Sequence, residues 1–196
     1  MMRFVGMLPL LLTVGCATTL PPVEATYDKQ PSITTSLTAK VTFTTGSVNG
    51  TIVRPWRMIQ LGSGFAAINS GQPVDARFGP EDQEDAQNLL GATLVEARVI
   101  GARLPLDSSV QPDLTIKLDF LKTDLVHQNL FYVLDVRMSI QGLEKHMERI
   151  YHIDVHEADS TAERWNSTFP RNKIKAKKML LNNAIPDIET FLKERN

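Results

Sequence analysis

The fold is decided by the stretch Leu114-Thr115-Ile116-Lys117-Leu118-Asp119-Phe120, in which every second residue is apolar. Successive side chains of a strand point to opposite faces, so this alternation predicts a strand with one buried and one solvated face. The same alternation recurs over residues 130–140 and 147–155, and Gly142 lies between these two segments. Three consecutive strands of this kind predict an antiparallel meander that is wet on one side.

Shorter strands are expected upstream of the meander. Residues 37–44 alternate in the same way, and an Asn-Gly turn signal follows at 49–50. Residues 51–54 are therefore expected to return as the hairpin partner of 37–44. Two further apolar segments, 57–61 and 65–69, flank a Gly-Ser-Gly turn and predict a second short hairpin.

Two amphipathic helices complete the expected fold. Pro80 opens the first helix, acidic residues occupy its first turns, and Gly101 is expected to end it. An irregular loop is expected over 157–172. Apolar residues then step by four and three positions from Ile174 to Leu192, which predicts a second helix that Pro186 kinks or splits. The predicted fold is an α+β two-layer sandwich, an antiparallel sheet with one face covered by two helices.

Composition narrows the class of protein. The chain has 196 residues, of which 42% are hydrophobic and 22% charged, which excludes collagen, a long coiled coil and wholesale disorder. The formal net charge of −1 gives no general attraction to nucleic acid, so no nucleic-acid partner is expected. The single cysteine excludes an intrachain disulfide.

The N-terminus has the layout of a secretory signal. Residues 1–15 carry one positive charge followed by a short apolar run. The stretch Leu12-Thr13-Val14-Gly15-Cys16 resembles the lipobox of bacterial lipoproteins, although Thr13 replaces the usual apolar residue. The resemblance implies cleavage before Cys16 and lipidation of that residue. Two alternatives are an ordinary cleavage after Ala17 and an uncleaved anchor.

The N-terminal pattern also sets the expected domain organisation and location. Residues 1–15 are predicted to be a signal peptide, 16–36 a lipidated cysteine with a flexible tether, and 37–196 a single periplasmic domain. Ala17 after the cysteine implies the periplasmic face of the outer membrane, by the sorting pattern known for enteric bacteria. An inner-membrane lipoprotein or a soluble periplasmic protein are the alternatives.

One candidate metal site lies on the third meander strand. His152, Asp154 and His156 are two residues apart, so all three share one face, and a His-x-His pair on a strand can bind zinc. That face also carries Lys117 and Arg137, and mixed charges of this kind are typical of a solvated surface. No cofactor is expected.

A basic run opens the second helix. It consists of Arg171, Lys173, Lys175, Lys177 and Lys178. These cations could meet anionic lipid headgroups or lipopolysaccharide phosphates, and the alternative is an ordinary solvated helix face.

The order of elements, with patterns such as Asp113-Leu114-Thr115-Ile116-Lys117-Leu118, resembles small bacterial lipoproteins of the YajG type and auxiliary lipoproteins of lipid-handling ABC transporters. The resemblance implies a non-enzymatic envelope role. The leading hypothesis is a lipid-anchored interaction or scaffold module with an envelope protein partner. The alternatives are an accessory subunit of a lipid-transport system, binding an apolar ligand or a transporter, and a metal-binding enzyme using His152, Asp154 and His156.

Overall fold

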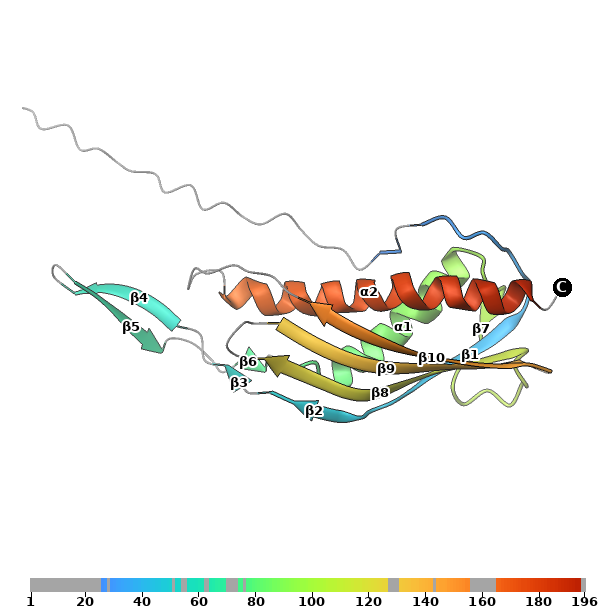
Figure 1. The fold of residues 1–196 in the computed structure, drawn as a ribbon, viewed down its shortest axis with the longest axis horizontal. Helices are drawn as coiled ribbons and strands as arrows, with labels where there is room; N and C mark the ends of the chain where they lie inside the picture. The colour runs from blue at the N-terminus through green and yellow to red at the C-terminus, as the bar shows by residue number, and fades with distance from the viewer. Residues whose placement is uncertain are drawn as a thin grey trace, which may run out of the picture.

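The computed structural model describes residues 26–27, 29–50, 52–53, 56–61, 64–69, 74–75, 77–126, 131–142, 144–155 and 165–194. Its main sheet has six strands in the order β10-β9-β8-β1-β7, and β2 pairs with β8 beyond the end of β1 (Figure 1). The strands are β1 (Thr38–Thr44), β2 (Ser47–Asn49), β7 (Ala102–Arg103), β8 (Leu114–Val126), β9 (Phe131–Gln141) and β10 (His146–Val155).

The sheet is mixed in direction. β8, β9 and β10 form the predicted antiparallel meander. In contrast, β1 and β2 run parallel to β8, and β1 also runs parallel to β7. The expectation of a wholly antiparallel sheet is therefore wrong. The reason is that α1 (Pro80–Glu96) connects the two parts of the sheet, and a helical crossover returns the chain in the parallel direction.

Two small two-stranded sheets are formed by the residues between β2 and α1. The predicted second hairpin is confirmed, because β4 (Trp56–Leu61) pairs antiparallel with β5 (Gly64–Asn69). The predicted hairpin of 37–44 with 51–54 is wrong. β3 (Ile52–Val53) pairs instead with β6 (Val74–Asp75). β1 already has β8 on one side and β7 on the other, so it could not take this partner along its whole length.

The two helices confirm the two-layer α+β arrangement. α2 (Trp165–Lys193) contacts β9 and β10, α1 contacts β1 and β7, and the helices contact each other. α2 begins inside the predicted loop 157–172 and continues as one helix through Pro170 and Pro186, so the expected split did not occur. A proline weakens an isolated helix. Here the buried apolar side chains of α2, including Leu181 and Ile185, pack against the core and stabilise the helix through both prolines.

The first helix ends earlier than its sequence pattern predicts. It stops at Glu96, and Arg98 takes the positive φ of 58° that turns the chain. Gly101 is not the terminator and has another use. A Cβ there would lie 2.7 Å from the carbonyl oxygen of Ser36, so a side chain would block the approach of the segment that leads into β1.

The core lies between the sheet and the helices. Leu118 and Leu134 are 0% and 1% exposed, which confirms the predicted buried face of the central strands. A register shift between Phe120 and Lys122 then changes which residues face inward, so that Thr123 is buried beyond it. The alternation in the sequence alone does not show this shift.

Candidate interaction surface

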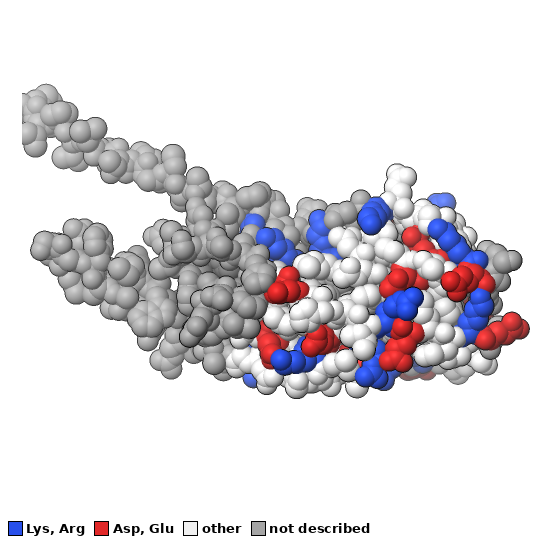
Figure 2. Space-filling model, in the orientation of Figure 1, with Lys and Arg blue, Asp and Glu red and all other residues white. Residues whose placement is uncertain are grey.

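The face of the sheet opposite the helices carries charged side chains arranged in pairs of opposite sign. Along β8, Lys117 pairs with Asp119 and Lys122 with Asp124, at 2.7 and 2.5 Å. Between β9 and β10, Arg137 pairs with Glu148 at 3.0 Å. On the part of the molecule that is not grey, Figure 2 shows Lys and Arg interspersed with Asp and Glu. A surface of this kind is wet and offers a partner both signs of charge at close spacing.

The pair at the far end of β8 is held in its charged form. The hydrogen bond from Lys122 keeps the pKa of Asp124 below its ordinary value, and the Asn49 amide donates a second hydrogen bond at 2.8 Å. The same carboxylate raises the pKa of Lys122. Asn49 is on β2, so this cluster also fastens the short strand to β8.

The predicted metal-binding residues are only partly brought together. His152 is 65% exposed, and its Nδ1 lies 2.7 Å from Oδ1 of Asp135, its direct cross-strand neighbour on β9. Asp154 is exposed on the same strand, and His156 lies outside the described residues. No group of three metal-ligating side chains occurs in the part of the chain that the structure describes. Zinc binding at this position stays a prediction.

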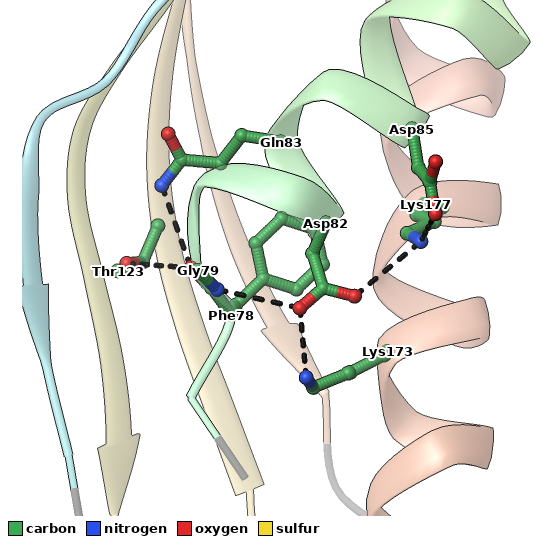
Figure 3. Close-up of polar contacts among 8 residues, drawn as sticks. All are labelled: Phe78, Gly79, Asp82, Gln83, Asp85, Thr123, Lys173 and Lys177. Atoms are coloured by element: carbon green, nitrogen blue, oxygen red, sulfur yellow. Dashed lines mark hydrogen bonds and ion pairs between the residues drawn. The ribbon is translucent and has the colours of Figure 1, made fainter. Parts of the chain in front are cut away.

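Two lysines of the basic run point at α1 rather than away from the molecule. Nζ of Lys173 lies 2.7 Å from one carboxylate oxygen of Asp82, and Nζ of Lys177 lies 3.4 Å from the other (Figure 3). Lys177 also pairs with Asp85 at 3.1 Å. Both lysine side chains are less than one-fifth exposed, at 19% and 12%. Their charges are therefore directed to the acidic start of α1.

Arg171, Lys175 and Lys178 are the other members of the run. They lie on α2 and have interactions of their own. Whether the run meets anionic lipid stays a prediction.

The acidic residues at the start of α1 have two roles, whereas the sequence pattern indicated only that acidic residues are favoured in the first turns of a helix. Asp82 accepts a hydrogen bond from the backbone N–H of Gly79 at 3.3 Å, which completes the helix cap, and it binds the two lysines (Figure 3). Just before the cap, the carbonyl of Phe78 accepts hydrogen bonds from Thr123 and Gln83. An acid at the third helical position was the signal that could have indicated the cap, but no local signal indicated the lysine partners.

The segment before β1 contacts the domain. Tyr27 and Ile33 pack against the core, and burial together with the charge of Glu189 raises the pKa of Tyr27. The backbone N–H of Thr35 donates to the carbonyl of Arg98 at 3.1 Å. The predicted start of the domain at residue 37 therefore falls within a segment that is already in contact with it.

The predicted lipidation site, Cys16, lies outside the described residues. Among the residues that are described, none of the helices combines the length and the apolar character needed to cross a bilayer.

No protein-family model and no curated protein matches this chain. Among solved structures, it is similar to protein XCC0632 from Xanthomonas campestris, assigned to DUF330, with 10% identity and a TM-score of 0.46 over 90% of this chain and 98% of that one. It is also similar to an uncharacterized protein, with 10% identity and a TM-score of 0.43 over 86% and 99% of the two chains. Both similarities are distant.

Proposed function

We propose that this protein is a lipid-anchored envelope lipoprotein on the periplasmic face of the outer membrane, where it acts as a non-enzymatic interaction module. The observation that carries the proposal is the position of Cys16, the chain's single cysteine, at the end of the apolar run and close to the folded part. Tyr27 already packs against the core. Even fully extended, the chain between these two residues spans at most about 40 Å. A lipid on Cys16 would hold the domain near the membrane surface.

The paired charges of the sheet suit such a module. Lys117, Asp119, Arg137 and Glu148 lie on a face that neither helix covers. Interspersed charges contribute little to the stability of the domain itself, and they give a partner orientation and specificity. We therefore assign contact with an envelope protein to this face.

The anchor is tested by fractionating cells that express the full chain with and without Cys16→Ser. The wild type is expected in the membrane fraction, labelled by radioactive palmitate, and the variant is expected in the soluble periplasm without label. Thr13→Leu, which restores the usual residue of the lipobox, is the matched control and should fractionate as the wild type does. Equal membrane association of Cys16→Ser and the wild type would contradict the anchor.

The interaction role is tested by cross-linking in intact cells, followed by identification of the captured proteins. Arg137→Glu should reduce capture of the envelope partner, because it reverses a charge on the uncovered face. Arg98→Glu makes the same change at an exposed position after α1 and should not reduce it. Capture of a transporter subunit, or a co-purified apolar ligand, would favour the lipid-transport alternative. If the purified chain holds zinc in a one-to-one ratio and His152→Ala loses that zinc, the metal-binding alternative is favoured.

A further inference from the structure

Among the described strands, β10 is the last of the main sheet on its side, and it is ten residues long. A terminal strand leaves half of its backbone N–H and C=O groups outside the ladder, which is a template for another strand. Ile150, in the middle of β10, is 64% exposed, more than any other large hydrophobic residue in the described part of the chain. The edge therefore combines backbone groups outside the described ladder with an exposed apolar side chain.

The exposed side chains of β10 are complementary to those of a second β10 strand that runs in the opposite direction. Alternation along the strand places His146, Glu148, Ile150, His152 and Asp154 on one face, and all five are exposed. In an antiparallel pair of two β10 strands centred on Ile150, that residue lies opposite its own copy. Each Glu148 then lies opposite a His152, and each His146 lies opposite an Asp154.

Neighbouring registers lose this complementarity. Shifting the centre from Ile150 to Arg149 places two arginines opposite each other and His146 opposite His152. Shifting it to Tyr151 places Glu148 opposite Asp154. Like charges directly opposite each other destabilise a strand pair, whereas opposite charges and apolar pairs stabilise it. One register is thus favoured over the adjacent ones.

The contacts with β9 extend the same pattern across four strands. Within one chain, Asp135 on β9 is 2.7 Å from His152, and Arg137 on β9 is 3.0 Å from Glu148. In the favoured register, a row runs from Asp135 through His152 to Glu148 and Arg137 of the second copy. In its protonated form, His152 can donate to Asp135 through one ring nitrogen and to Glu148 of the second copy through the other, and Arg137 donates to that Glu148. The β9 contacts hold both β10 side chains in place before the second strand arrives.

We infer that β10 is the docking edge for a second copy of this chain, giving a two-fold symmetric dimer with one continuous sheet. The two-fold axis passes through the Ile150 pair, as an isologous interface requires. α2 packs over β9 and β10, so the α2 helices of the two copies come to lie next to each other on the same side of the sheet. Confinement of both copies to one membrane by the proposed anchor would raise their effective concentration.

The register is tested with cysteine variants of the full chain, purified in detergent and mildly oxidised. Ile150→Cys should form a disulfide-linked dimer, because residue 150 lies opposite itself. Val110→Cys is the matched control, since Val110 is 60% exposed but lies in the segment between β7 and β8. The parent chain controls for any disulfide formed through Cys16 in molecules that lack the lipid. At least ten-fold more linked dimer from Ile150→Cys than from Val110→Cys is expected, and equal yields would overturn the inference.

A mixed experiment distinguishes this register from any other contact through β10. A mixture of Glu148→Cys and His152→Cys chains should give more linked dimer than either variant alone. Residue 148 faces residue 152 of the other copy but lies about 13 Å along the strand from the other residue 148. More linkage within either single variant than in the mixture would overturn the register.

A charge reversal tests the pairing without cysteines. His152→Glu places a second carboxylate opposite Glu148 and should weaken the dimer at least ten-fold in sedimentation equilibrium. Adding Glu148→Lys to the same chain should restore it. Circular dichroism verifies that the exposed substitutions leave the fold intact. If His152→Glu leaves the dissociation constant of the dimer unchanged, the inference is overturned. It is also overturned if the wild-type chain stays monomeric at the concentration of a membrane-anchored protein.

Discussion

The two sides of the main sheet end in different ways. On the β1 side, the short strand β7 covers the start of β1, and the backbone N–H of Leu104 donates to the carbonyl of Ala39 at 2.8 Å. Two residues on, the carbonyl of Val41 accepts a hydrogen bond from the buried side chain of Gln87 on α1. On the β10 side, the sheet order ends with a ten-residue strand whose wet face is exposed.

This difference shows how one sheet combines a closed edge and an open one. The closed edge is made by residues far apart in the chain, since β1, α1 and the residues after α1 all meet there. The open edge is made by a single strand and its neighbour. Changes on the closed side should therefore cost folding free energy, and exposed changes on the open side should affect association instead.

The largest effect is expected from Gly46→Ala, on the closed side. Gly46 lies between β1 and β2, opposite the register shift of β8, and a Cβ there would lie 1.5 Å from the carbonyl oxygen of Phe120. Because the clash is with backbone, both strands must move, and we expect a loss of about 3 kcal/mol or more in urea unfolding. Gly79→Ala is the control, since a Cβ at Gly79 meets nothing within 4 Å. Similar losses for the two variants would contradict the tight approach.

A smaller loss is expected from Gln87→Met. This change removes the side-chain donor to the Val41 carbonyl and keeps the volume, so the buried carbonyl loses a partner at a cost of about 1–3 kcal/mol. The matched control is Gln83→Met. The Gln83 side chain is also buried, but its Oε1 has no hydrogen-bond partner among the described residues, and the Phe78 carbonyl keeps the bond from Thr123. If chemical denaturation gives the two variants the same stability, Gln87 does not close this edge.

On the β10 side, a hydrogen bond on the covered face joins the strand to α2. The hydroxyl of Tyr151 donates to Asp187 on α2 at 2.7 Å, and burial, together with Asp187, raises the pKa of Tyr151 above its ordinary value. Below pH 9, Tyr151→Phe should lose about 1–2 kcal/mol through the lost hydrogen bond.

The pH dependence of that loss has a definite sign. Above pH 10 the unfolded tyrosine ionises while the folded one stays neutral, so the native state binds more protons and its stability falls as the pH rises. Tyr151→Phe lacks this contribution, so the gap between the two proteins should narrow above pH 10 in unfolding measurements. A gap that widens there would contradict the raised pKa.

The smallest effect on stability is expected from Ile150→Thr, on the open face. Ile150 is 64% exposed, so the change should alter the unfolding free energy of the dilute protein by less than about 0.5 kcal/mol. Ile153→Thr is the matched change on the same strand. Ile153 is 0% exposed, and its replacement removes buried methyl contacts and buries a hydroxyl, at a cost of about 2 kcal/mol or more. Equal losses at the two positions would mean that β10 is covered on both faces.

The meander and both helices could be predicted because their periodicity is local. Leu118 and Leu134 fall on the buried face as their alternation predicts. The parallel placement of β1 could not be predicted in this way, since an alternating strand reads the same in either direction and its partner is 75 positions away at Ala39–Leu114. The Asn-Gly signal was misleading for the same reason: a turn signal marks a bend but does not name the strand that follows.

In the candidate site, too, some features follow from local periodicity and others depend on tertiary contacts. The alternation in β10 determined which of its residues are exposed together, because side-chain direction in a strand depends only on position. Only the tertiary structure decided that Asp135 faces His152 and that Lys173 and Lys177 are directed to Asp82, since these contacts depend on register and on the packing of α2 against α1. Local periodicity acts over a few residues and is written in the sequence, whereas the choice of partner depends on the whole core packing at once.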